Sequence, residues 1–208
     1  MQRTFTPKTT VHIQPTTNSA LKSTIIQNIE NWCQFYKLTD DDITHLSIIE
    51  NSNIYNFYTS LLYLLYPKYH LLYTFEQKLD MVEELLRFMM TKIATDPIIK
   101  GQLQLKRINA NPLLIELKSK PIQTANVVMF AALLFDINII VVPIAPKSAI
   151  EVYFNDPEYD NCKPHIICGR DAQQIYHPIT YRDQTLLNYF DHPVIKSLLE
   201  QNKIIEKN

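Results

Sequence analysis

Glycine is almost missing from this chain of 208 residues, since only Gly101 and Gly169 occur where average usage would give about 15. The P-loop and the dinucleotide-binding fingerprint both need several glycines in one short run, because only glycine lets the backbone approach a phosphate closely. The composition therefore excludes nucleotide chemistry of those two kinds. We expect no cofactor.

Cysteine is also scarce, with Cys33, Cys162 and Cys168 forming an odd number without framework spacing. This pattern argues against a disulfide-stapled secreted domain and favours a reducing compartment, with the cytoplasm as the default. Cys162, His165 and Cys168 have a spacing that could supply metal ligands. However, His165 and Cys168 fall in a predicted strand at positions that point to opposite faces, so we expect no metal site.

An excess of either charge is absent too, because 20 basic and 21 acidic residues leave a net charge of -1. A basic field for nucleic-acid binding is therefore not expected.

The N-terminus has no apolar run, which argues against a signal peptide. Residues 127–145 are strongly apolar, but Asp136 and Asn138 lie at their centre and Pro143 follows. A buried helix followed by a buried strand explains this segment better than a membrane span.

What is present is an ordinary globular composition, with 46% hydrophobic and 20% charged residues. Ile, Asn, Lys and Tyr make up 68 of the 208 residues, which points to an AT-rich genome such as that of many large DNA viruses. We expect an extended tail over residues 1–19 and one globular domain over residues 20–208. Its class is α+β, a small mixed sheet packed by helices.

Hydrophobic periodicity and turn residues predict the order of the elements. Thr74 and Gln77 form a capping-box pattern that opens a long amphipathic helix. Two strand-like runs follow, separated by Asn109, Asn111 and Pro112, and they predict a hairpin. The predicted helices are 20–37, 39–49, 55–66, 75–95, 123–135 and one or two within 183–207; the predicted strands are 103–108, 113–118, 137–142, 150–154, 165–168 and 174–179.

Three segments carry a family resemblance: Phe57-Tyr58-Thr59-Ser60-Leu61, residues 133–142 and residues 169–179. They resemble segments of the ovarian-tumour (OTU) family of cysteine deubiquitinases. The first is similar to the helix that follows the catalytic cysteine in that family. Residues 133–142 are similar to its helix-to-strand junction, and residues 169–179 are similar to its final loop and strand. The resemblance covers roughly residues 45–182. It implies an OTU-like cysteine-protease architecture and a ubiquitin-like protein partner.

The departures from the family pattern fall on its catalytic residues. Its Asp-Gly-Asn-Cys turn becomes Asn53-Ile54-Tyr55-Asn56, so Asn56 stands at the position of the nucleophile. Ile175 stands at the position of the catalytic histidine, and a shift of two residues would place His177 there. An asparagine has no thiolate and cannot attack a carbonyl. The resemblance thus implies an inactive member in which residues around the lost site bind a protein: Asn53, Tyr55, Asn56, Tyr58, Tyr176 and His177.

Two other functions remain open. One is an active cysteine deubiquitinase or protease with a rearranged site, in which Cys33 or Cys162 acts with His177 or His165. Cys33 lies late in a predicted amphipathic helix, where a buried structural thiol is the commoner case. The other is a structural or assembly protein, for example of a virus particle, that does not bind a modifier.

Overall fold

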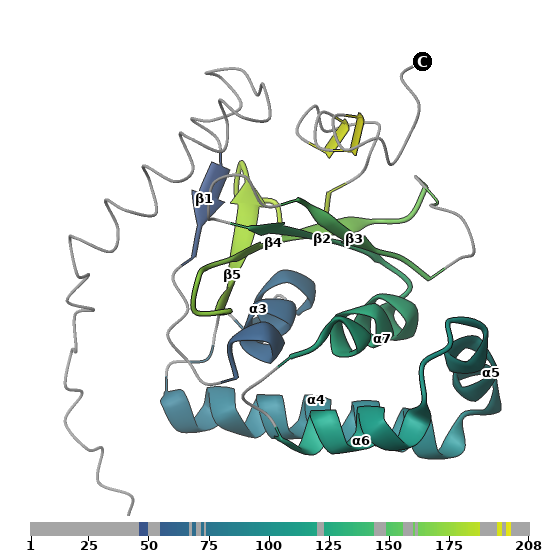
Figure 1. Cartoon of the computed structure of the whole chain (residues 1–208). Helices are drawn as coiled ribbons and strands as arrows, with labels where there is room; N and C mark the ends of the chain where they lie inside the picture. The colour runs from purple at the N-terminus through teal and green to yellow at the C-terminus, as the bar shows by residue number, and fades with distance from the viewer. Residues whose placement is uncertain are drawn as a thin grey trace, which may run out of the picture.

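The computed structural model describes residues 46–49, 55–66, 68–69, 72, 74–119, 123–143, 149–155, 160, 162–187, 195–196 and 199–200. They form an α+β fold in which a mixed sheet is covered on one face by helices (Figure 1), as the sequence predicts. In chain order the elements are β1 (Leu46–Ile48), α3 (Asn56–Leu65), α4 (Phe75–Thr95), α5 (Pro97–Leu105), α6 (Ala110–Ser119), α7 (Ala125–Phe135), β2 (Asn138–Pro143), β3 (Glu151–Tyr153), β4 (His165–Arg170) and β5 (Tyr176–Tyr181).

The sheet has five strands in the order β1-β5-β4-β2-β3. Only β2 and β4 run parallel, with Asn138 opposite His165, and the other neighbouring strands are antiparallel. β1 covers only the second half of β5, because its register ends with Ile48 opposite Ile179. Within the described residues, the first residues of β5 are thus not paired with β1.

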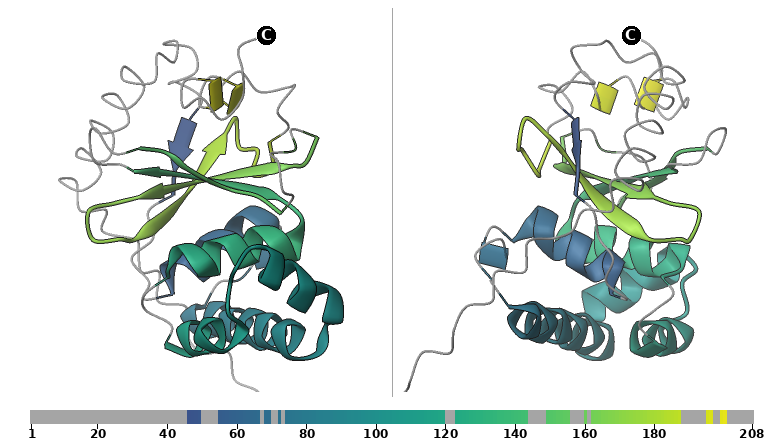
Figure 2. Two further views of the ribbon diagram at one scale, coloured as in Figure 1. Left: turned by 45° about the vertical axis from the view of Figure 1, so that its right-hand side comes forward. Right: turned by 90° about the vertical axis from the view of Figure 1, so that its left-hand side faces the viewer.

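Helices α3 and α7 pack directly against the sheet, and α4 and α6 form a second layer beneath them (Figures 1 and 2). Both helices of the inner layer are apolar almost all round, which is typical of helices buried on two sides. Side chains alternate between the two faces of β2, and both faces of this strand are buried. Ile139 and Val141 belong to the main core under the helices, whereas Ile140 and Val142 are buried on the opposite face.

The long helix α4 confirms its sequence prediction. The Thr74 hydroxyl accepts a hydrogen bond from the Gln77 amide at 3.1 Å, and the Gln77 side chain accepts one from the Thr74 amide at 3.3 Å. This reciprocal pair satisfies two backbone donors that a helix start leaves unpaired. Its buried face is formed by Val82, Leu85, Leu86, Met89 and Ile93.

The predicted hairpin over residues 103–118 is wrong, because both runs are helical, in α5 and α6. Asp96 caps α5 by accepting hydrogen bonds from the amides of Ile98 and Ile99. Burial does not follow the alternation of a strand. Leu103 is buried, whereas Leu105, which a strand would place on the same face, is 83% exposed. Alternation over four residues fits both a strand and a helix, so the sequence pattern was ambiguous.

Two further predictions need correction. Residues 46–48, predicted to end a short helix, form β1, because they pair with β5. Residues 183–187 form turns and isolated bridges rather than a helix, although residues 195–196 and 199–200 are helical. The predicted tail 1–19 and the helix 20–37 lie outside the described residues.

The apolar segment after residue 123 is a helix followed by a strand, α7 and β2, as predicted. Asp136 joins them in the left-handed conformation, with φ 54° and ψ 48°. Within the described ranges, every helix is too short or too polar to cross a membrane.

Candidate functional site

The start of α3 lies against the start of β5, and two side chains of α3 hold the backbone of one residue there. The Asn56 Oδ1 atom accepts a hydrogen bond from the Tyr176 amide at 2.9 Å, and the Ser60 hydroxyl donates to the Tyr176 carbonyl at 3.0 Å. Asn56 and Ser60 are one helical turn apart, so they share a face. We call this pair the Tyr176 clamp. Together the two side chains satisfy both backbone hydrogen-bonding groups of Tyr176.

Aromatic packing holds the same contact. The Phe57 ring lies 5.1 Å from the Tyr176 ring, centroid to centroid, at an angle of 66°. Tyr58 and Tyr176 are both buried, with 0% and 2% of their surface exposed. Burial raises the pKa of Tyr58 and of Tyr176, so both hydroxyls stay neutral at physiological pH. These two predicted binding residues thus form core contacts, whereas Tyr55, at the N-cap of α3, is half-buried.

The predicted fallback histidine, His177, has a carboxylate partner. Its Nε2 atom lies 3.2 Å from the Asp171 Oδ2 atom. Asp171 is fixed by the loop before β5, because its Oδ1 atom accepts hydrogen bonds from the amides of Gln173 and Ile175. His177 itself is only 3% exposed.

This His–Asp pair lies on the other side of the sheet from α3. Side chains alternate between the two faces of a strand, and Tyr176 points toward Phe57 of α3. His177 therefore points away from α3, while the Asn56 side chain reaches β5 from the helix side. The structure brings Asn56 to the backbone of Tyr176, but it does not bring the imidazole of His177 to Asn56. Ile175 is half-buried and contributes its amide to Asp171.

The described cysteines differ sharply in exposure. Cys168 on β4 is fully buried, and burial raises the pKa of its thiol to about 12. Cys162 is exposed in a loop, and its amide donates to the Asp160 carboxylate at 2.9 Å. Cys33 and Asn53, the remaining predicted site residues, lie outside the described residues. Cys168 has the properties of a structural thiol.

His165 is a buried histidine of β4 that contacts Asn138 of the neighbouring strand β2. Its Nε2 atom lies 3.1 Å from the Asn138 Nδ2 atom, and Asn138 also donates to the Asp160 carbonyl. Burial lowers the pKa of His165 to about 4, so the ring is neutral at pH 7. His165 and Cys168 point to opposite faces, since Cys168 belongs to the main core. In the part of the chain described here, no three potential ligands gather closely enough to hold a metal ion.

Sequence reasoning missed a polar network beside the Tyr176 clamp. Arg170 pairs with Glu151, with 3.1 Å between its Nη1 atom and Glu151 Oε2, and the Tyr153 hydroxyl donates to the same carboxylate at 2.5 Å. Arg170 stands opposite Tyr176 in the register of β4 and β5, and it partly offsets the effect of burial on the pKa of Tyr176. These residues come from three strands, so only the strand register could have revealed the network.

Comparison with known proteins gives a fold but no close relative. No protein-family model and no curated protein matches the sequence. A solved structure of the OTU domain of OTUD1 is similar to this chain, with a TM-score of 0.52 and 11% sequence identity. The match covers 77% of this chain and 99% of that domain. The fold of this chain is therefore OTU-like, as the sequence resemblance implies, whereas at this identity the activity of that domain does not transfer with it.

Proposed function

We propose that this chain is a catalytically inactive OTU-like domain that acts as a protein-binding module, with a ubiquitin-like modifier as the first candidate partner. The observation that carries the proposal is the state of Asn56. This residue stands at the first position of α3, where the resemblance places the nucleophile, and only 5% of its surface is exposed. Its carboxamide oxygen is engaged in the Tyr176 clamp. The position thus has a structural role in place of a chemical one.

The arrangement of histidines supports the same proposal. A nucleophile needs a base within hydrogen-bond reach. His177 points away from the start of α3, and His165 is fully buried beside Asn138. The OTU-like fold supports a protein as the partner. The fold is kept, whereas the residues that hydrolysis would need are absent from these positions.

The test measures binding and cleavage in one sample of the full chain. Calorimetry follows mono-ubiquitin binding, and gel analysis follows cleavage of di-ubiquitin, with an active OTU protease as the positive control. We expect binding without cleavage. Cleavage that is abolished by alkylating the thiols would instead establish a rearranged cysteine hydrolase. The absence of both binding and cleavage would favour a structural or assembly role.

A pair of matched variants locates the binding surface. Tyr55 and Tyr63 are both half-buried tyrosines of the α3 region, at its N-cap and near its C-terminal end respectively. Tyr55→Ala should weaken ubiquitin binding by about tenfold, since truncating an aromatic anchor commonly has an effect of that order. Tyr63→Ala should leave binding unchanged. Equal effects of both variants would place the binding surface elsewhere.

A further inference from the structure

Helix α5 presents large apolar side chains to solvent. Among the large apolar side chains of the described residues, Leu105 and Ile98 are the most exposed, with 83% and 71% of their surface exposed. Gly101 lies between them, and the spacing of i, i+3 and i+7 places all three residues on one face of the helix. The opposite face is buried through Ile99 and Leu103. The fold therefore uses only one of the two apolar sides of α5.

The outer face of α5 is open. Within the described part of the chain, no heavy atom beyond the adjoining helix backbone lies within 4 Å of the place that a Cβ atom at Gly101 would take. The helix packs on α4 and α7 and lies at one edge of the molecule (Figure 1). A partner could thus approach this face without moving another element.

Every charged residue of this segment is basic. From Pro97 to Ile115 the chain contains Lys100, Lys106 and Arg107, and no carboxylate. Lys100 and Arg107 are exposed, and neither forms an ion pair within the described residues. Lys106 lies over the Phe154 ring, with its Nζ atom 4.9 Å from the ring centroid. The apolar face is therefore flanked by positive charge alone.

The carboxylates on either side of this segment already have partners. Asp96 caps the start of α5 and forms an ion pair with Lys92, with 3.1 Å between Oδ2 and Nζ. Glu116 on α6 accepts a hydrogen bond from the Thr124 hydroxyl. Neither carboxylate pairs with a basic residue of α5.

The helices packed on α5 do not offset its charge either. Helix α7 has no charged residue, and Asp136, which follows it, forms an ion pair with Lys163 at 2.6 Å. The second half of α4, Leu85–Thr95, contains Arg87 and Lys92 and no acidic residue. The positive charge of α5 is thus available to an anionic partner.

Arg107 occupies a position that usually holds glycine. The end of α5 is a Schellman motif, in which the Arg107 amide donates to the Gln104 carbonyl at 2.9 Å and the Ile108 amide donates to the Leu103 carbonyl at 2.8 Å. Arg107 has a φ of 57°, and glycine is preferred in this conformation because it has no Cβ atom. The turn does not require an arginine, so its exposed charge beside the apolar face needs another explanation.

An anionic membrane surface accounts for these features together. Aliphatic side chains enter the boundary between headgroups and acyl chains, and anionic headgroups attract lysine and arginine. A flat bilayer also needs no hollow, whereas the anchors of a protein interface usually fill pockets. We propose that α5 binds an anionic membrane surface, with Ile98 and Leu105 entering this boundary. Lys100 and Arg107 contact the headgroups beside them.

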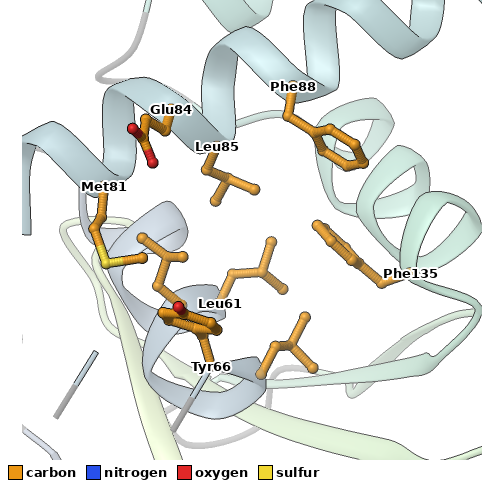
Figure 3. Close-up of a pocket in the computed structure, with 9 residues that line it drawn as sticks. Leu61, Tyr66, Met81, Glu84, Leu85, Phe88 and Phe135 are labelled. Atoms are coloured by element: carbon orange, nitrogen blue, oxygen red, sulfur yellow. The ribbon is translucent and has the colours of Figure 1, made fainter. Parts of the chain in front are cut away.

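This surface is separate from the other apolar surface of the molecule and from the candidate site. The groove of about 330 Å³ between α3 and α4 (Figure 3) has charges of both signs on α4, where Glu84 lies near Lys78 and Arg87, so its charge favours no particular occupant. The proposed ubiquitin binding uses the start of α3. Failure of either binding proposal would therefore leave the other intact.

The experiment is sedimentation of the full chain with vesicles of phosphatidylcholine alone or with about 30% phosphatidylserine. The whole chain has a net charge of -1, so attraction to anionic vesicles requires a local basic surface. We expect binding to the anionic vesicles to be about tenfold tighter than to the neutral ones. Equal binding to both, or no binding to anionic vesicles at about 1 mM lipid, would overturn the proposal. A helical peptide of leucine and glutamate is measured in parallel, and its binding in the absence of vesicle binding would instead indicate a protein partner.

Matched variants locate the surface. Arg107→Gly should weaken vesicle binding by about fivefold and keep the turn, because glycine suits its backbone conformation. Arg182→Gly makes the same change at another exposed residue with a positive φ, 49°, beyond the end of β5, and should leave binding unchanged. Leu105→Ser should weaken binding by about tenfold, whereas Phe75→Ser, which truncates a 64% exposed side chain at the start of α4, should not. Equal losses in a variant and its control would refute the proposed placement, and thermal unfolding confirms that each variant is folded.

Discussion

The carboxamide oxygen of Asn56 accepts a hydrogen bond from the backbone amide of Tyr176, 120 residues further along the chain, at 2.9 Å. Among the described residues, the backbone bond between the β1 segment and β5 that lies nearest to this contact runs from the Ile49 amide to the Pro178 carbonyl. A buried amide without an acceptor destabilises the folded state. Asn56 thus belongs to the structure of the sheet edge, at a position where the resemblance implies a nucleophile.

We expect Asn56→Ala to reduce the free energy of unfolding by about 1–3 kcal/mol, because the Tyr176 amide would lose its acceptor in a buried place. Urea unfolding measured by circular dichroism checks this value. Asn111→Ala is the matched control, since Asn111 is exposed on α6, and it should change stability by less than about 0.5 kcal/mol. Equal stability of the two variants would mean that the Tyr176 clamp contributes nothing.

Asn56→Cys should not restore hydrolysis. The new thiol would lie at the start of α3, while the imidazole of His177 is held by Asp171 on the opposite face of the sheet. Without a base within hydrogen-bond reach, the new thiol lacks the partner that takes up its proton and activates a catalytic cysteine. The measurement is reaction with ubiquitin carrying a C-terminal electrophile, followed by mass spectrometry. A rapid covalent adduct on Cys at this position would show that a base does reach it.

Prediction from sequence succeeded where two independent local signals agreed. For α4, the capping residues Thr74 and Gln77 and a long apolar stripe both indicated a helix, and the observed bounds match. For α5 and α6 the only signal was a short alternation, and tertiary packing decided the outcome by burying Leu103 and exposing Leu105. β1 is three residues long, and its strand conformation depends on pairing with a distant segment.

The sequence indicated which residues form the candidate site, but not how their side chains are oriented. The resemblance brought Asn56 and the start of β5 together, and the structure places them in contact. The resemblance could not indicate on which face of the sheet His177 lies. Ile175 and Gln174 lie in a loop whose backbone includes a positive φ of 64° at Gln174. The network of Arg170 and Glu151 depends on strand register, which no local pattern contains.

The two described cysteines should react at very different rates with iodoacetamide at pH 8. Cys162 is exposed, whereas Cys168 is fully buried and burial raises the pKa of its thiol to about 12. The thiolate is the reacting form, so Cys168 should be modified only after the chain unfolds. Peptide mapping by mass spectrometry distinguishes the sites, and labelling in urea is the control. Modification of Cys168 in the folded chain as fast as Cys162 would contradict its burial.

Protonation of His165 should couple folding to pH. Burial lowers the pKa of this group from 6.5 to about 4 in the folded chain, so its unfolded form binds a proton at a higher pH than its folded form. The contribution of His165 to the free energy of unfolding is therefore fully present above pH 6.5. It falls as the pH drops toward 4, by roughly 1.4 kcal/mol per pH unit within that window. Urea unfolding at pH 7, 6 and 5 measures the change, with His165→Gln as the reference, because glutamine does not titrate. The unfolding free energy of the variant should depend less steeply on pH than that of the unmodified chain, and parallel curves would show that another group carries the dependence.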